Sequence, residues 1–261
     1  MTLALIAGTG DMPGAIVARL ADRPLICAMQ GFEPALEPDL TFRIERLGSF
    51  LGQLNLQGVR EVCMVGAVRR PYFDAGMVDA ETAPLVPVIA EAMGRGDDGA
   101  LRAIIAIFER AGFSVRAAQE IAPDLLPPPG VPTAARPDSA MIAEAAVGLR
   151  HLAVMGRADS GQACLVKGRE LVAEEGPDGT DAMIAAAGAA ARGAILYKGP
   201  KPGQDRRADL PVIGPATAEA AVASGLRGIV IEADGVMVLD LPRVVGTLDA
   251  GGAVLWVREG A

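Results

Sequence analysis

The stretch Leu3-Ala-Leu-Ile-Ala-Gly-Thr-Gly-Asp-Met-Pro13 opens with five apolar residues and then turns, through two glycines, into a helix signal. A short apolar run of this kind is typical of a strand that is buried on both faces of a parallel sheet. Strand and helix signals continue to alternate through the first half of the chain. This βαβ pattern predicts an α/β fold with a doubly wound parallel sheet. The further strands are expected at 24–28, 61–65 and 114–117, and the helices at 14–21, 49–58, 82–93 and 98–111.

Proline is concentrated between residues 125 and 137, where five prolines and one glycine occur. Such a stretch predicts a semi-rigid connector. We therefore expect an N-terminal parallel-sheet domain at 1–126, a proline-rich linker at 127–137 and a C-terminal α/β domain at 138–261. In the second half, Gly168-Arg169 indicates a hairpin between two strands. The other elements are expected as helices at 139–155, 181–191 and 216–224, strands at 194–198, 228–232, 236–239 and 253–257, and a polar loop at 199–215.

Composition excludes several classes of function. Hydrophobic residues make up 51% of the 261 residues, which is ample for a packed core. The formal net charge of -8 and the aromatic content of only 3% argue against a nucleic-acid partner. Cys27, Cys63 and Cys164 lie far apart and are expected to be buried thiols. Because His151 is the only histidine, a multi-histidine metal site cannot form.

The chain opens directly into a predicted strand and has no signal-peptide pattern. No apolar run approaches the roughly 20 residues that a membrane-spanning helix needs. The sequence therefore predicts a cytoplasmic protein.

The glycine-rich turn Gly8-Thr-Gly10 follows the first strand. Backbone N–H groups at such a turn can bind phosphate, so Gly8 and Gly10 are candidate contacts; a tight turn without a ligand is the alternative. A dinucleotide fingerprint is disfavoured, because Pro13 stands where the third glycine belongs and Gln30 stands where an acidic residue would hold a ribose.

Three further motifs carry charge at predicted strand or helix ends. Arg69 and Arg70 follow the third strand, where a guanidinium can grip phosphate or simply lie in a solvated loop. Asp97 and Asp98 follow Gly96 at the start of a predicted helix. Their carboxylates can cap the helix or contact a ligand, and capping is the favoured interpretation. At Gly179-Thr180-Asp181, a hydroxyl and a carboxylate can cap a helix, or serve a hydrated Mg²⁺ or a nucleotide hydroxyl.

The densest charge pattern lies between Lys198 and Asp209, with four cations and two carboxylates on a loop stiffened by prolines and glycines. The cations can neutralise phosphate oxygens, and the carboxylates can recruit Mg²⁺ or orient water. A solvated charge run is the alternative, but it leaves the glycines and prolines unexplained. The candidate residues are Lys198, Lys201, Gln204, Asp205, Arg207 and Asp209.

Taken together, these motifs resemble the LpxI family of UDP-2,3-diacylglucosamine pyrophosphatases, which act in lipid A biosynthesis. The matching blocks occur in the family's order and cover most of the chain. They are Leu-Ile-Ala-Gly-Thr-Gly-Asp-Met-Pro at 5–13, Gly-Ala-Val-Arg-Arg-Pro at 66–71, Gly-Asp-Asp at 96–98, Ser-Gly-Gln at 160–162, Gly-Thr-Asp-Ala-Met at 179–183, and Lys-Pro-Gly-Gln-Asp-Arg-Arg-Ala-Asp-Leu-Pro-Val-Ile-Gly-Pro-Ala-Thr at 201–217. Asp178 and Ala67 depart from the Glu and Asn that are frequent in the family.

The resemblance implies a Rossmann-like N-terminal domain, a family-specific C-terminal domain and a substrate that lies between them. It implies Mg²⁺-dependent attack of water on the β-phosphorus, giving UMP and 2,3-diacylglucosamine 1-phosphate. Asp209 matches the essential carboxylate, Asp205 is the second choice, and Asp209 with Asp181 is expected to hold the metal. The expected substrate contacts are Gly8, Gly10, Arg69, Arg70, Gly161, Gln162, Thr180, Asp181, Lys198, Lys201, Gln204 and Arg207.

The implied partner is a small lipid-linked nucleotide sugar, with transient contact at the inner membrane surface, where the protein would be peripheral. The sequence leaves open whether the chain forms a homo-oligomer. Two other functions stay open as alternatives. One is a nicotinamide-dependent oxidoreductase of the Rossmann type, and the other is a non-catalytic carrier of a nucleotide sugar or lipid.

Overall fold

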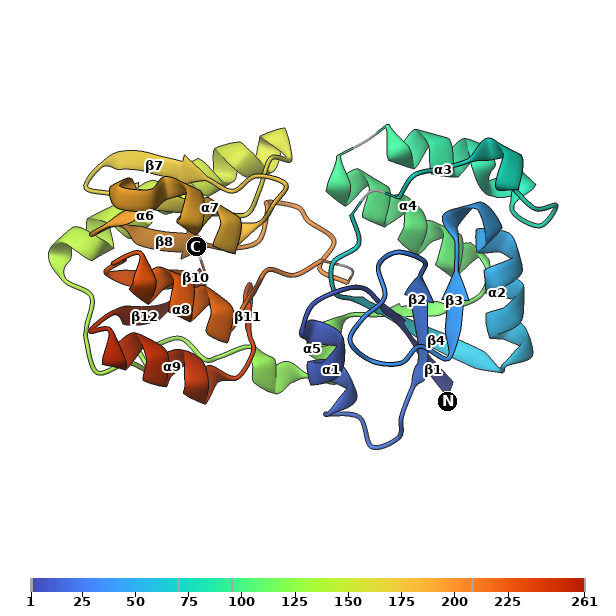
Figure 1. Cartoon of the computed structure of the whole chain (residues 1–261), viewed down its shortest axis with the longest axis horizontal. Coiled ribbons are helices and arrows are strands. Elements are labelled where there is room, and N and C mark those ends of the chain that lie inside the picture. The colour runs from blue at the N-terminus through green and yellow to red at the C-terminus, as the bar shows by residue number, and fades with distance from the viewer. Residues whose placement is uncertain (1, 70, 95, 208, 261) are drawn as a thin grey trace. The chain divides into compact units, whose positions relative to one another are not determined.

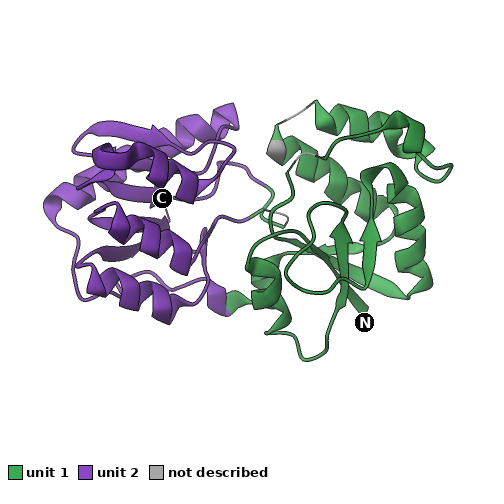
Figure 2. Ribbon diagram, in the orientation of Figure 1, with its two compact units in different colours: residues 1–123, 205–209 green, residues 124–204, 210–261 purple. Residues whose placement is uncertain are grey.

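A computed structural model describes residues 2–69, 71–94, 96–207 and 209–260 of the chain. The chain forms two compact units (Figure 2). Unit 1 comprises Met1–Pro123 together with the short segment Asp205–Asp209. Unit 2 comprises Asp124–Gln204 and Leu210–Ala261. A short piece from the second half of the sequence therefore belongs to the first unit.

Within the described residues, unit 1 is built on a five-stranded parallel sheet in the order β3-β2-β1-β4-β5 (Figure 1). The strands are β1 (Thr2–Ala7), β2 (Leu25–Met29), β3 (Leu40–Phe42), β4 (Val59–Val65) and β5 (Ser114–Arg116). The order changes direction between β1 and β4. Open α/β sheets bind their ligands beside such a switch point, beyond the carboxyl ends of the strands.

Helices cover both faces of this sheet (Figure 1). On one face, α2 (Leu47–Leu56), α3 (Val86–Met93) and α4 (Asp97–Arg110) bury Phe50, Ile89 and Phe108 against Val62 of β4. On the other lie the short helices α1 (Met12–Val17) and α5 (Ala118–Ile121), with Ile16 of α1 fully buried. Short 3-10 turns occur at η1 (Ile44–Arg46), η2 (Ala75–Met77) and η3 (Ala83–Leu85), and η4 (Pro123–Leu125) leads into unit 2.

Unit 2 has a mixed sheet in the order β12-β10-β8-β6-β7. β12 (Val254–Arg258), β10 (Gly228–Glu232) and β8 (Ile195–Lys198) run parallel. β6 (Ala163–Lys167) is antiparallel to β8 and forms a hairpin with β7 (Glu170–Glu174). A small parallel pair joins β9 (Val212–Ile213) to β11 (Met237–Val238).

The sheet of unit 2 is also covered on both faces. The long helix α6 (Ser139–Ala158) buries Leu152 and Met155 against Tyr197 of β8. On the opposite face, α7 (Thr180–Ala187), α8 (Pro215–Ala223) and α9 (Leu241–Ala250) pack over Leu196, and the 3-10 turn η5 (Gly188–Ala191) follows α7. Strand residues alternate between the two clusters, so both faces of each central strand are apolar.

The predicted α/β class, with its parallel first sheet, is confirmed. The expected strands of the first half and the hairpin at Gly168 are present, with Gly168 at φ +63°. Four helices or strands were not predicted: β3, α5, α9 and β9, the last of which lies in the stretch expected as a polar loop at 199–215. The expected start of a helix at Ser49 is wrong, because α2 begins at Leu47 and Ser49 lies inside it. Ser49 instead points its hydroxyl at Glu81.

Cys27, Cys63 and Cys164 are buried and free, as expected. Burial raises the pKa of each thiol to about 12. Among the described residues, no helix combines the length and the apolar character needed to cross a bilayer.

Candidate functional site

The switch point of unit 1 is closed by backbone pairing between the β1 and β4 loops. Thr9 N donates to Ala67 O at 3.0 Å and Ala67 N donates to Thr9 O at 2.9 Å. A Cβ at Gly8 would lie 2.5 Å from Ala67 O, so only glycine allows this approach. The close turn accounts for Gly8 without a ligand. Gly10 has φ +95°, which also favours glycine. A phosphate contact at either glycine stays a prediction.

The structure describes one of the two predicted arginines in the loop after β4. Arg69 is exposed beyond the end of β4. Arg70 lies outside the described residues. An exposed guanidinium at the carboxyl edge of a parallel sheet is suitably placed for an anion, which agrees with the prediction for Arg69 without testing it.

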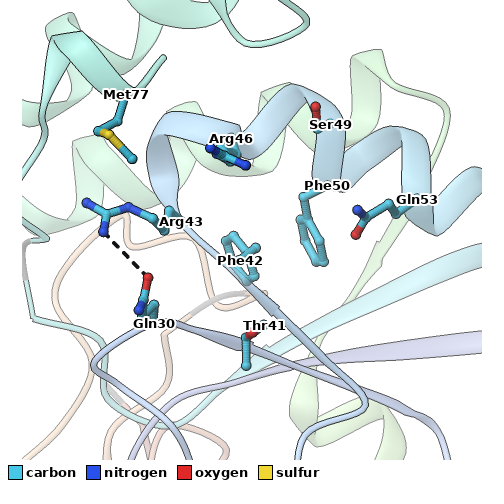
Figure 3. Close-up of a pocket in the computed structure, with 9 residues that line it drawn as sticks. All are labelled: Gln30, Thr41, Phe42, Arg43, Arg46, Ser49, Phe50, Gln53 and Met77. Carbon is cyan, nitrogen blue, oxygen red and sulfur yellow. Dashed lines mark hydrogen bonds between the residues drawn. The ribbon is translucent and has the colours of Figure 1, made fainter. Parts of the chain in front are cut away.

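A pocket of about 380 Å³ opens at the same edge of unit 1, beyond β2 and β3 (Figure 3). Gln30 follows β2 and Arg43 follows β3. Phe42 and Phe50 stack with their ring centroids 4.0 Å apart. Sequence patterns did not indicate this pocket, because it depends on β3, which they missed. Its lining residues are Gln30, Thr41, Phe42, Arg43, Arg46, Ser49, Phe50, Gln53 and Met77.

The segment Asp205–Asp209 is held in unit 1 by charged groups. Arg207 donates to both oxygens of Asp205, from Nε at 3.0 Å and from a terminal nitrogen at 2.8 Å, and it reaches Glu109 at 2.6 Å. Asp205 N donates to Asp98 Oδ1 at 3.1 Å. The hydrogen bonds from Arg207 lower the pKa of Asp205 and raise that of Arg207. The carboxylate of Asp205 is thus engaged in an ion pair.

The segment Asp205–Asp209 is also held by an uncharged hydrogen bond, and it ends at a half-buried carboxylate. The Gln119 side-chain amide donates to Arg206 O at 3.1 Å, which adds a neutral tie between α5 and the segment. Asp209, the expected essential carboxylate, is half-buried at the end of the segment.

In unit 2, predicted residues gather at the carboxyl end of β8. The Lys198 ammonium donates to the Thr180 hydroxyl at 2.7 Å, and both side chains are buried. The Thr180 hydroxyl donates to Glu175, whose other oxygen accepts from Gln162 N at 2.8 Å. Lys198 lies 3.7 Å from Glu175. A Cβ at Gly161 would lie 2.5 Å from Glu175 O, so this glycine allows the close packing.

The loop that follows β8 carries a second pair. The Lys201 ammonium lies 2.5 Å from Asp159, and the Lys201 side chain is only 9% exposed. Lys201 N donates to the side-chain oxygen of Gln204 at 3.0 Å, which closes the loop on itself. Lys198 and Lys201 therefore stand at one end of the sheet, each beside one carboxylate.

The carboxylate of Asp181, the residue after Thr180, makes a contact of its own. Its Oδ1 accepts from the Thr217 hydroxyl at 2.9 Å, which joins the start of α7 to α8. Gly179 is the N-cap of α7, and no side-chain hydrogen bond caps this helix. Simple capping by Thr180 or Asp181 is therefore wrong, because the Thr180 hydroxyl bonds to Glu175 and the Asp181 carboxylate accepts from Thr217.

Sequence reasoning missed Glu175 and Asp159. Both lie next to matched blocks, yet each is one acidic residue among many on a chain with 32 of them. Only the folded positions of β7 and α6 bring these carboxylates to the lysines. For the described residues, no group of three or more His, Cys, Asp and Glu side chains could enclose a metal.

Comparison with known proteins gives two findings. Residues 2–125 match the model of the LpxI N-terminal domain, and residues 128–256 match the model of the LpxI C-terminal domain. The chain is also similar to the UDP-2,3-diacylglucosamine pyrophosphatase LpxI of Caulobacter vibrioides (strain ATCC 19089 / CIP 103742 / CB 15). The two are 34% identical over 262 residues, covering 95% of this chain and 94% of that protein.

Proposed function

Because the chain belongs to the LpxI family along nearly its whole length, we propose that it hydrolyses the diphosphate of UDP-2,3-diacylglucosamine. The products would be UMP and 2,3-diacylglucosamine 1-phosphate. The observation that carries this proposal is the 34% identity over 95% of the chain to a protein named for this pyrophosphatase activity. The buried lysine cluster in unit 2 supports it chemically.

The charges of the chain fit the demands of phosphoryl transfer. Water attacks the β-phosphorus, the bond from that phosphorus to the bridging oxygen breaks, and UMP leaves with the bridging oxygen. Negative charge builds up on the phosphoryl oxygens and the leaving oxygen, so positioned cations lower the barrier. Lys198 is held by Thr180 and Glu175, and Lys201 by Asp159, so both ammonium groups are preorganised.

Asp209 is our candidate for the carboxylate that orients the attacking water or helps to hold the metal. Asp205 is the second candidate for a catalytic carboxylate. Its ion pair with Arg207 fits a role in ordering the segment that carries Asp209. Arg207, the other partner of this ion pair, contributes to catalysis by ordering the same segment.

We propose Mg²⁺ as the cofactor, with Asp209 and Asp181 as its protein ligands. Oxygen donors suit this hard cation, which commonly uses one or two carboxylates together with substrate phosphates. The absence of a three-carboxylate group among the described residues is compatible with that mode. When bound, Mg²⁺ supplies charge neutralisation at the diphosphate.

The decisive experiment is release of UMP from UDP-2,3-diacylglucosamine by the purified full-length protein, followed chromatographically. We expect stoichiometric UMP and 2,3-diacylglucosamine 1-phosphate. Binding of the substrate without any UMP would favour the carrier alternative. A change in NADH fluorescence on titration, with no hydrolysis, would favour the oxidoreductase.

We also propose a cytoplasmic location with transient contact at the inner membrane, because the substrate carries two acyl chains. The loop after β4 supports this. Val68, Tyr72 and Met77 are 44%, 83% and 41% exposed, and Arg69 beside them is exposed too. Apolar and aromatic side chains next to a cation suit an anionic lipid surface. Co-sedimentation with phosphatidylglycerol vesicles should weaken in Tyr72→Ser, whereas Leu56→Ser on α2 serves as an exposed control.

A further inference from the structure

Three polar side chains that the proposed mechanism does not use meet at the carboxyl ends of the parallel strands of unit 2. Arg258 of β12 donates from a terminal nitrogen to the Tyr197 hydroxyl at 3.2 Å, and this hydroxyl donates to Glu232 Oε1 at 3.0 Å. Glu232 and Arg258 are partners in the register of β10 and β12, which brings their side chains to the same face of the sheet. A directed chain of hydrogen bonds therefore ends at the Glu232 carboxylate.

The Tyr197 hydroxyl keeps its proton in this arrangement. Its side chain has no exposed surface and packs in the cluster under α6. Burial, together with the negative charge of Glu232, raises the pKa of Tyr197 above its ordinary value. A neutral phenol can donate to the carboxylate and accept from the guanidinium at the same time. The Glu232 carboxylate is thus oriented by a rigid, buried neighbour.

The same carboxylate lies against the backbone that leaves β8. A Cβ at Gly199 would come within 2.8 Å of Glu232 Oε1, and because Tyr197 holds this oxygen, it cannot easily retreat. The next residue, Pro200, packs against Gly235 in the turn after β10, where a Cβ would lie 2.7 Å from the proline ring. Gly199 and Pro200 are both buried. The chain that leaves β8 is therefore seated on Glu232 and on the turn that follows it.

The residues at 198–204, which we call the lysine loop, carry the two cations of the proposed chemistry. Lys198 is the last residue of β8, and Lys201 follows three residues later. The backbone between them is held by the hydrogen bond from Gly199 N to Gln162 O at 3.2 Å and by the contact with Glu232. A shift of this backbone would move both ammonium groups. Cations that stabilise a transition state lose much of their effect when they are misplaced by about 1 Å.

We propose that Glu232 is a positioning residue for the lysine loop. Its carboxylate, oriented by Tyr197, supports the backbone at Gly199 and thereby fixes where the two lysines stand. The effect on turnover rests on the proposed function, whereas the ordering of the loop does not. Glu232→Ala leaves a space beneath the loop. Glu232→Gln keeps the shape and an oxygen that accepts from the Tyr197 hydroxyl, so it is the conservative variant.

Two readouts on the purified full-length protein test this role. The first is hydrogen exchange, followed by mass spectrometry of peptides that cover the lysine loop. Glu232→Ala should speed exchange there about tenfold, because the unsupported loop opens more often. The second is steady-state release of UMP from UDP-2,3-diacylglucosamine. Glu232→Ala should lower kcat about tenfold and change KM less than about twofold, since the lysines act on the transition state. Glu232→Gln should restore both readouts.

Two further variants separate positioning from a loss of stability. Arg227→Met is the matched control, because Arg227 pairs with the buried Glu144 at the opposite, amino-terminal end of β10. It should lower the melting temperature and leave the exchange of the lysine loop and the kinetics as in the parent. Tyr197→Phe keeps the ring and removes the hydroxyl that orients Glu232. It should change both readouts in the same direction as Glu232→Ala by a smaller factor, which keeps the test available if Glu232→Ala does not fold.

The outcomes separate this inference from the proposed function. Unchanged loop exchange in Glu232→Ala, or equally fast exchange in Arg227→Met, overturns the positioning role even when the parent releases UMP. Exchange in Glu232→Gln as fast as in Glu232→Ala also overturns it, as does an active parent whose kcat is the same in Glu232→Ala. If the exchange responds as expected and the parent releases no UMP, the proposed function fails and the ordering of the loop by Glu232 stands.

Discussion

Glu175 can be tested as the residue that holds the lysine cluster of unit 2 together. In Glu175→Ala, the buried Lys198 loses its carboxylate at 3.7 Å, and Gln162 N loses its acceptor at 2.8 Å. Neither charged side chain is more than 9% exposed, so water cannot easily replace the lost partner. The variant leaves a buried cation without compensation.

The expected magnitude follows from this burial. Removing one partner of a buried ion pair costs about 3–5 kcal/mol. We expect the lower end, about 3 kcal/mol, because Lys198 keeps its hydrogen bond to Thr180. At roughly 2–4 °C per kcal/mol, the melting temperature should fall by about 6–12 °C.

Thermal unfolding followed by circular dichroism measures this change. Glu174→Ala is the matched control, because Glu174 is the adjacent and exposed carboxylate, and it should stay within about 0.5 kcal/mol of the parent. Adding Lys198→Met to Glu175→Ala should recover part of the loss, because the uncompensated charge is then gone. Equal melting temperatures for Glu174→Ala and Glu175→Ala would refute the reasoning.

Four further predictions address the proposed chemistry and the electrostatics. Asp209→Ala should abolish UMP release and leave substrate binding nearly intact, since a carboxylate that acts on the transition state affects rate more than affinity; near-normal turnover of the folded variant would exclude the assignment. EDTA should abolish UMP release and added Mg²⁺ should restore it; full activity after exhaustive chelation would exclude the metal requirement. The pKa of Asp205 is lowered by Arg207, so its stabilising contribution is present above the unfolded carboxyl pKa of about 4 and is lost as pH falls through the folded value. Acid unfolding of Arg207→Met, followed by fluorescence, should therefore show a weaker pH dependence below about pH 4; an unchanged profile would contradict this. Finally, an aromatic disulfide reagent should find no reactive thiol in the native protein and all three after denaturation, because burial raises each thiol pKa to about 12; rapid native labelling would disprove it for Cys27, Cys63 and Cys164.

Local patterns predicted the elements whose signals are strong and continuous. The apolar run before Gly8 formed β1, and the run Gly228–Glu232 formed β10 at the expected residues. Weak signals failed. β3 is only Leu40–Phe42, too short to show a period, and α9 begins behind Asp240, whose left-handed φ of +49° is not a common cap conformation. These elements depend on packing that a single segment does not encode.

The sequence by itself determined the class of the fold and the family, because hydrophobic period, turn glycines and ordered motif blocks are local properties; it also named the candidate site residues, which stay predictions. Tertiary structure alone decided which of these groups meet. Strand order placed Glu175 beside Lys198 and opened the pocket beyond β2 and β3. The packing of Asp205–Asp209 in unit 1 engaged Arg207 with Asp205 and with Glu109, which lies nearly a hundred residues away from Arg207 in the chain. Contacts at such separations follow from sheet order and side-chain burial across the whole unit, which no local pattern carries.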